Sequence, residues 1–500
     1  MSGGNDFFKT AKGSIEQAMA FWPASGDGKS QSAQDRSNIE IPARTECIGR
    51  ITCVDGERLI LFLDGRMGAM DASFNLVKST LVKIASTTTI TYGVVVSLSV
   101  PAPGQSDAYH EVELAEIELV GEAIATENRV VFHKGVSEIP VLGDLVYLAN
   151  RDDVRLIEEK AQKQALKMGE AMDILSGPVL LAAPEVLSAP TLICGGSEED
   201  RAIGVVSLCN QVLLNGGGAQ ILAFDTTGVM SGHFSDEADL RHLHESGFPF
   251  WKLGAEALIF MAYGDHCASV VMPTLLPGVA SALRQDWSAV KGNKFEAFLE
   301  VLASKIATAG LDGQVLELFQ ALPEHPAYQS LFSNEAKAFD VHALSSELTI
   351  LNMSRLPILA QHLVIASLVE ELSNSPTRPF CIFDVATGLY SDELSYGDAM
   401  VQRKMMRYLL QAKSNGHGAV LVSQHAYMIS EHIKALLGNV IAFHAQSTKE
   451  IEVLQNLNID KRGAALDLLP LLGSGQALIF GDAVSLAQRC ALKFVDEARD

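Results

Sequence analysis

From Pro184 onward, short and fully apolar runs alternate with segments of helix length, and this pattern restricts the fold more than any other feature. A strand that is apolar on both faces must be covered on both, and strands that alternate with helices usually pair in parallel. We therefore predict an α/β fold with a parallel-rich sheet between layers of helices. The runs are Thr191–Cys194, Gln220–Phe224, Leu348–Asn352, Pro379–Phe383, Ala419–Val422, Val440–Phe443 and Ala477–Phe480.

The segment from about 235 to 345 has a different pattern. No strong strand run appears there, and leucine and alanine recur at helical spacing. This spacing predicts a helical insertion into the α/β core. The core itself is then expected at 151–234 and 346–500, and it opens with a charged helical stretch at about 152–172.

Residues 38–150 show a third pattern, which is typical of an all-β domain. Short β-branched runs such as Ile48–Val54 and Thr89–Leu98 are separated by turn signals such as Asp55-Gly56 and Asp64-Gly65. Several strands at this spacing predict a small barrel or a sandwich.

The first 37 residues form a separate tail. Ser25 to Ser37 is rich in Gly, Ser, Gln and Asp, which is typical of a linker. Before it, large apolar residues recur near helical spacing, so a short helix could dock on a partner or a membrane, or simply pack on its own domain. The charges of Lys9 and Lys12 are offset by acidic neighbours, so the basic face of a membrane-binding helix is missing. The apolar positions are Phe7, Phe8, Ala11, Ile15, Ala18, Met19 and Trp22.

Charge and cysteine content limit the function classes. The formal charge is −22 and the sequence pI is about 5.0, which excludes a uniformly basic nucleic-acid-binding surface but not a local basic groove. No apolar run is long enough to span a bilayer, and no secretory signal is recognisable. The seven scattered cysteines contain no CxxC pair, which favours reduced thiols in the cytoplasm over disulfides or zinc.

The apolar run Thr191–Cys194 leads into a candidate phosphate-binding loop. Gly195, Gly196 and Ser197 follow it, and a helix-like stretch begins shortly afterwards. Strand, glycine turn and helix are the context of such a loop, which also needs a second glycine, a lysine and a Ser or Thr hydroxyl. Those three positions hold Asp200, Arg201 and Ala202. Together with Glu198 and Glu199, Asp200 places negative charge where a triphosphate would bind. The segment alone would read as an ordinary strand–turn–helix.

Two further strand ends are candidate site positions. Asp384 ends the run that begins at Pro379, which is the form of a Walker B motif, where the aspartate orients Mg²⁺. The next position is Val385, which cannot act as a general base. Gln424 follows the run at Ala419 and could sense a terminal phosphate or simply cap a helix.

Several histidines invite a metal-binding interpretation. No zinc spacing fits them, so we expect surface or core histidines and no metal other than Mg²⁺ at Asp384, if any. They are His233, His242, His244 and His266 in the run Asp265-His266-Cys267.

The order of these segments resembles the HerA-type ring ATPases of the HerA/FtsK superfamily, from about residue 40 to the end. The similar motifs are Glu46–Ile51, Val131–Val146, Ile221–Gly228, Phe248–Leu253, Ile350–Leu356, Leu421–Gln424 and the closing segment Leu468–Gly481. The resemblance implies an N-terminal β-barrel, a RecA-like P-loop-type core with a helical insertion, and a hexameric ring that passes duplex DNA through its pore, often beside a nuclease.

Three departures from the family pattern concern the chemistry. They are Arg201 with Ala202 in place of Lys-[ST], Val385 in place of glutamate, and Ala412–Gly416 in place of a basic run that supplies transition-state charge. Arginine does not replace a lysine point charge well, because its planar fork needs another geometry. Weak ATP–Mg²⁺ binding and no required cofactor are therefore expected.

The leading hypothesis is a ring subunit that has lost, or nearly lost, ATP hydrolysis and acts as a structural or regulatory partner of a HerA-like paralogue or a nuclease in DNA handling. An active, divergent ATP-driven DNA translocase is the second hypothesis, and a scaffold without a DNA role is the third.

Overall fold

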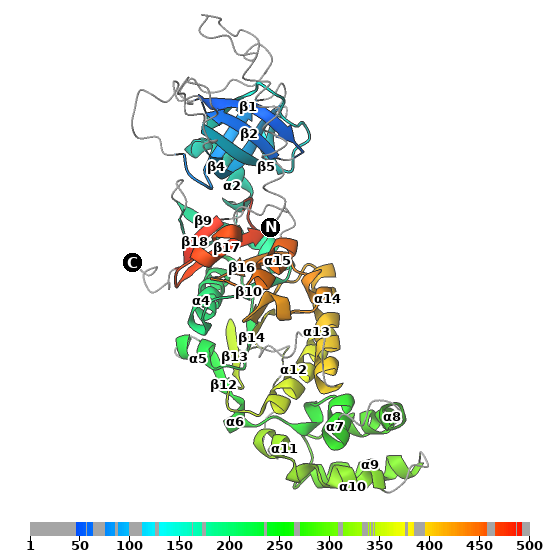
Figure 1. The fold of residues 1–500 in the computed structure, drawn as a ribbon. Helices are drawn as coiled ribbons and strands as arrows, with labels where there is room; N and C mark the ends of the chain where they lie inside the picture. The colour runs from blue at the N-terminus through cyan, green and yellow to red at the C-terminus, as the bar shows by residue number, and fades with distance from the viewer. Residues whose placement is uncertain are drawn as a thin grey trace, which may run out of the picture.

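The computed structural model of the 500-residue chain describes most of the sequence after residue 46. The described residues are 47–56, 58–63, 76–85, 89–99, 113–125, 130–162, 164–172, 177–234, 238–264, 271–308, 314–332, 339, 341, 344, 346–375, 379–384, 396–457, 466–486 and 488–492. The tail 1–37, Glu46, Val385 and the run 265–267 lie outside them. Barrel, α/β core and helical insertion follow one another along the long axis of the molecule (Figure 1).

Of the two predicted architectures, a small barrel or a sandwich, the N-terminal domain has the first: it is a closed antiparallel barrel. The strand order is β2-β1-β7-β3-β4-β5, β2 also pairs with β5 to close the barrel, and β6 extends the sheet beyond β5. Ile51, Leu61, Val82 and Ile117 are among the side chains that fill its centre. The strands are β1 (Cys47–Asp55), β2 (Arg58–Leu63), β3 (Leu81–Ala85), β4 (Thr89–Ser99), β5 (Glu113–Ala125), β6 (Val130–Lys134) and β7 (Leu145–Leu148).

The core is built on one sheet with the order β12-β13-β11-β14-β15-β10-β16-β17-β18-β8-β9. The strands from β12 to β16 are parallel, and those from β17 to β9 pair antiparallel. The strands are β8 (Ala165–Ala171), β9 (Pro178–Ala182), β10 (Thr191–Cys194), β11 (Ile221–Asp225), β12 (Asp239–His242), β13 (Leu348–Asn352), β14 (Phe380–Asp384), β15 (Ala419–Ser423), β16 (Asn439–Ala442), β17 (Gln476–Gly481) and β18 (Gln488–Leu492).

Helices cover both faces of this sheet, which explains why its strands are apolar throughout. Alternate residues of β10 point to opposite faces: Leu192 and Cys194 join the cluster that contains α12 and α13, whereas Ile193 joins the cluster that contains α4. The core helices are α3 (Ala183–Ser188), α4 (Glu198–Asn215), α5 (Val229–His233), α6 (Leu243–Ser246), α12 (Ile358–Ser373), α13 (Tyr396–Ser414), α14 (Glu431–Lys434), α15 (Thr448–Leu457), η6 (Ala426–Met428) and η7 (Leu466–Leu471). The helix α2 (Arg151–Gln162) instead packs against the barrel, where its Ile157 joins Leu81 and Tyr92. The predicted α/β fold class is confirmed.

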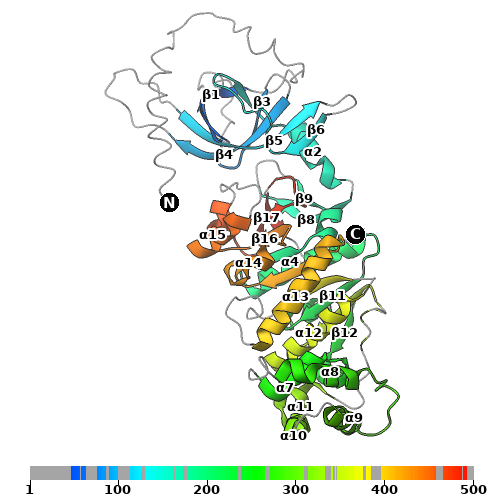
Figure 2. The same cartoon turned by 90° about the vertical axis from the view of Figure 1, so that its right-hand side faces the viewer.

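The helical insertion lies at the end of the core that is far from the barrel (Figure 2). An aromatic cluster that includes Phe250, Trp287, Phe295 and Phe298 fills its interior. The elements are η2 (Phe250–Lys252), α7 (Ala255–Tyr263), α8 (Val271–Leu283), α9 (Lys294–Thr308), α10 (Gln314–Gln320), η4 (Leu322–Glu324) and α11 (Pro326–Leu331).

Two local predictions were wrong. The helix expected at about 152–172 ends at Gln162, and Ala165–Ala171 is a strand. At Gly169 in this strand, the Cβ of any other residue would lie 2.2 Å from the Ala491 backbone oxygen. The segment 235–345 also contains a strand, because β12 pairs in parallel with β13 at the sheet edge. Its sequence Asp-Leu-Arg-His lacks the apolar run that marks the buried strands.

Candidate functional site

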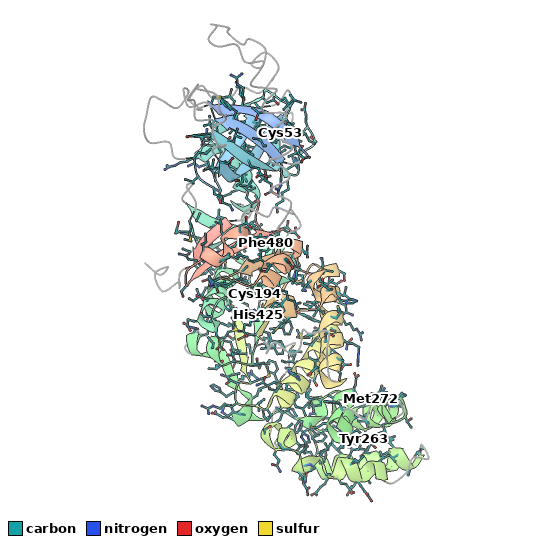
Figure 3. All side chains as sticks on the ribbon, in the orientation of Figure 1. Cys53, Cys194, Tyr263, Met272, His425 and Phe480 are labelled. Atoms are coloured by element: carbon teal, nitrogen blue, oxygen red, sulfur yellow. The ribbon has the colours of Figure 1, made fainter. Side chains whose placement is uncertain are left out.

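The predicted site residues meet at one edge of the sheet. Cys194 of β10 is in register with Ser423 of β15, and Asp225 of β11 is in register with Asp384 of β14. Because β15 lies between β10 and β14, the segments that follow these strands all begin at the same carboxyl edge. Figure 3 labels Cys194 and His425 in this part of the core.

The loop after β10 is shorter than the spacing of a phosphate loop requires. Gly195 and Gly196 have φ of +80° and +59°, and a Cβ on either would come within 2.8 Å of Phe443 atoms. Only glycine satisfies both conditions. The helix α4 already begins at Glu198, so Glu198 and Glu199, two of the four residues that should form the loop, are helical.

Backbone carbonyls of the protein take the N–H groups of both glycines. Gly195 N donates to the Gln424 carbonyl at 3.2 Å, and Gly196 N donates to the His444 carbonyl at 2.9 Å. In a phosphate-binding loop such N–H groups face the ligand. Here they join the loop to the segments that follow β15 and β16.

A capping box begins α4. Ser197 Oγ accepts a hydrogen bond from Asp200 N, and Asp200 Oδ2 accepts from Ser197 N at 2.9 Å and from Ser197 Oγ at 2.8 Å. The other oxygen, Asp200 Oδ1, accepts from Ser474 Oγ and from Gly475 N, both at 2.8 Å. Burial raises the pKa of Asp200, but these hydrogen bonds outweigh it and hold the pKa below its ordinary value.

Arg201 does not extend toward a ligand position. Its Nη1 donates to the carbonyls of Gly195 and Gly196, at 3.1 Å each. Ala202, at the position of the Mg²⁺-binding hydroxyl, is 4% exposed. Arg201 therefore stabilises the turn that precedes its own helix.

Asp384 ends β14 beside a threonine that the sequence interpretation did not single out. Thr227 Oγ1 donates to Asp384 Oδ2 at 2.8 Å and contacts Asp225 Oδ1 at 3.3 Å. Burial raises the pKa of Asp384 to about 6; the Thr227 hydrogen bond opposes this, and the Asp225 charge adds to it. The signal in the sequence was the D-x-x-G pattern Asp225–Gly228, which places Thr227 one residue before the glycine.

The buried Asp225 carboxylate has a structural role. It accepts hydrogen bonds from Gly228 N at 2.7 Å and from Ser231 N at 2.9 Å, which fixes the turn into α5. That turn carries Thr227 to the sheet edge.

Gln424 is exposed and contributes its backbone carbonyl to Gly195. The loop after it is held by Glu450 of α15, which is 1% exposed and accepts from Ala426 N at 2.6 Å and Tyr427 N at 3.3 Å. A buried carboxylate thus positions the segment that meets the loop after β10.

The remaining candidates do not assemble into a site among the described residues. No group of three or more His, Cys, Asp or Glu side chains there could hold a metal ion. His233 lies 3.7 Å from Glu199, and the rings of His242 and His244 are 5.7 Å apart. In the described part of the chain, no helix is long and apolar enough to cross a membrane.

The comparisons with known proteins give structural likenesses only. No family model and no curated protein matches the sequence. VirB4 of Thermoanaerobacter pseudethanolicus aligns at 12% identity with a TM-score of 0.49, over 66% of this chain and 96% of VirB4. The bacterial conjugative coupling protein TrwBdeltaN70 aligns at 11% identity with a TM-score of 0.41, over 68% of this chain and 92% of that chain.

The DNA-packaging ATPase B204 of Sulfolobus turreted icosahedral virus aligns at 10% identity with a TM-score of 0.30, over 62% of this chain and 99% of B204. Because the identities and TM-scores of these three alignments are low, they say nothing about the chemistry of this chain. The barrel, the RecA-like strand order and the helical insertion are those that the resemblance implied. In fold, the chain resembles the HerA/FtsK-type ATPases.

Proposed function

We propose that the chain is a HerA-like ring subunit of a DNA-processing or DNA-translocating assembly that has lost, or nearly lost, nucleotide chemistry. It acts as a structural or regulatory partner of a HerA-like paralogue or a nuclease, in the cytoplasm. The observation that carries this proposal is the state of the loop after β10: the N–H groups of Gly195 and Gly196 are bound by protein carbonyls, and Asp200 occupies the position of the second glycine.

ATP–Mg²⁺ does not fit the described loop residues. Glu198, Glu199 and Asp200 place three carboxylates in the first turn of α4, and no lysine or hydroxyl stands at 201 or 202. Repulsion between these carboxylates and a triphosphate at close range opposes binding. We therefore route no catalytic step through a nucleotide, and any ATP–Mg²⁺ binding is expected to be weak.

The test measures ATP binding by calorimetry and ATP hydrolysis by phosphate release, with the purified chain alone and with the products of neighbouring genes. We expect background hydrolysis by the chain alone. Micromolar ATP affinity, or turnover that disappears in Asp384→Asn, would overturn the proposal.

One observation favours the second candidate, an active and divergent ATP-driven translocase. Asp384 and Thr227 place a carboxylate and a hydroxyl 2.8 Å apart at the edge where Gly195 also lies. A scaffold without a DNA role is the third candidate. Binding of a duplex oligonucleotide by the assembled oligomer at low salt separates the scaffold from the other two.

A further inference from the structure

Besides Phe443, the side chain that comes closest to the position of a Cβ on Gly196 is acidic. A Cβ on Gly196 would lie 2.9 Å from Asp200 Oδ2 and 3.0 Å from Asp200 Cβ. Glycine in a phosphate-binding loop lets an anion approach the backbone closely. In this molecule the anion that makes this approach is the Asp200 carboxylate.

The same carboxylate has four hydrogen-bond donors on two segments. Oδ2 is held by Ser197 N and Ser197 Oγ, which is the ordinary capping box, and Oδ1 is held by Ser474 Oγ and Gly475 N. The second pair comes from the turn before β17, and the Gly475 carbonyl in turn accepts from Leu492 N of β18 at 2.9 Å. A capping box alone needs no partner outside its helix.

The surroundings favour a permanent negative charge at this position. Asp200 is 6% exposed and lies in the first turn of the 18-residue helix α4, where the helix dipole stabilises anions. Two backbone N–H groups and two hydroxyls are the kind of donors that hold a phosphate oxygen. A bound phosphate could take these donors only if Asp200 first left them.

We propose that Asp200 is a built-in anion that takes the place of a ligand phosphate in the loop after β10 and fastens this loop to the 473–475 turn. We call the four hydrogen bonds to the Asp200 carboxylate the latch. The latch deepens the proposed function and rests on it, because it supplies the reason why the loop excludes nucleotide. Releasing Asp200 removes this anion from the loop and frees the 473–475 turn from it.

The first experiment measures amide hydrogen exchange at Ser197 and Gly475, the two backbone donors, in the full-length chain. Asp200→Asn keeps the size but has one acceptor oxygen, so whichever way the amide lies, one of the two donor pairs loses its partner. We expect exchange at one of these amides to rise about tenfold or more. Ser474→Ala should raise it at Gly475 and leave Ser197 unchanged.

The matched control is Glu199→Gln, which neutralises the exposed neighbour that lies near His233 and leaves Asp200 in place. It should leave both amides protected. Unchanged protection at both amides in Asp200→Asn would overturn the latch. That result is separate from failure of the proposed function, which would appear as ATP turnover by the unaltered chain.

The second experiment separates the latch from simple repulsion. Calorimetry with pyrophosphate compares Glu198→Gln/Glu199→Gln with the same chain that also contains Asp200→Asn. Both variants lack the two exposed charges, and only the second lacks the latch. We expect measurable binding in the second variant, at an affinity at least about tenfold higher than any binding in the first. Equal affinities, or none in either variant, would overturn the claim that Asp200 excludes the anion.

Discussion

At the scale of single residues, the site is defined by carboxylates with opposite environments. Asp200 is surrounded by donors, and its pKa lies below the ordinary value. Asp384 is half-buried next to Asp225, and desolvation raises its pKa to about 6. The sequence placed Asp384 at a strand end, whereas it placed Asp200 in the loop before the helix, and Asp200 lies in the first turn of α4. It could not show which donors surround each carboxylate. Ser474 is 274 residues from Asp200 in the sequence.

The raised pKa of Asp384 predicts a pH-dependent stability. The pKa of Asp384 in the folded state is above its ordinary value of 3.8, so the folded state binds more protons than the unfolded state between about pH 4 and 6. The free energy of unfolding therefore falls as pH rises through this window. Asp384→Asn removes that cost. In denaturant titrations with EDTA, we expect the variant to be more stable than the unaltered chain by on the order of 1–2 kcal/mol at pH 8, and equal to it at pH 4. A variant that is less stable at pH 8 would contradict this.

Restoring the phosphate-loop sequence should restore ATP–Mg²⁺ binding without restoring ATP hydrolysis. Asp200→Gly, Arg201→Lys and Ala202→Ser together should allow measurable ATP–Mg²⁺ binding, because the missing glycine, lysine and hydroxyl return. Hydrolysis should stay near background, since position 385 still lacks a base. The loss of the Asp200 hydrogen bonds should lower the stability by on the order of 2–4 kcal/mol. Calorimetry, phosphate release and thermal melting measure the three effects, and Arg201→Lys alone is the control. Substantial turnover would show that another residue acts as the base.

At the scale of elements, the apolar runs predicted the buried strands within about one residue of their positions. Thr191–Cys194 is β10 itself, and Gln220–Phe224 differs from β11 by one residue at each end. Among the strands that were missed, β12 is an edge strand, and β8 lies in the antiparallel part of the sheet next to the edge strand β9. Both β8 and β12 contain charged side chains, and their burial comes from partners that are distant in sequence.

The buried Glu450 gives a prediction at this scale. Its carboxylate holds Ala426 N and Tyr427 N, so Glu450→Ala leaves two buried donors without partners and loosens the loop after β15. We expect a loss of about 1–3 kcal/mol in the free energy of unfolding. Glu452→Gln, an exposed carboxylate on the same helix, is the control and should change it by less than about 0.5 kcal/mol. An equal effect of the two substitutions would show that Glu450 does not hold the loop.

At the scale of the whole molecule, the barrel is connected to the core by more than the chain itself. Lys134 of β6 donates to the Gly481 carbonyl of β17 at 2.8 Å, and Lys78 pairs with Asp467 of η7 at 3.1 Å. The order of barrel, core and insertion could be predicted from the sequence, because apolar residues recur with a different spacing in each part. The contacts between them did not, because exposed lysines have no distinguishing pattern.

Assembly is the prediction at this scale. Under the proposed function the chain is retained for its surfaces, and closed rings use heterologous contacts that need no hydrolysis. We expect an oligomer, homomeric or mixed with a paralogue, that forms without nucleotide in light scattering at micromolar concentration. Its DNA affinity should be modest and strongly salt-dependent, because the formal charge of each chain is −22. A monodisperse monomer, with and without candidate partners, would overturn the ring.

The position of β10 in the sheet also determines when the protein can fold during synthesis. Its Thr191 pairs with Val420 on one side and Asn439 on the other, so neither neighbour exists until most of the chain has left the ribosome. The barrel, whose strands all lie before residue 150, can close long before that. Until β15 and β16 emerge, a fully apolar strand waits without its final partners, and such long-range pairing is slow and prone to aggregation. The nascent core is therefore the part of this protein that is most exposed to aggregation during synthesis.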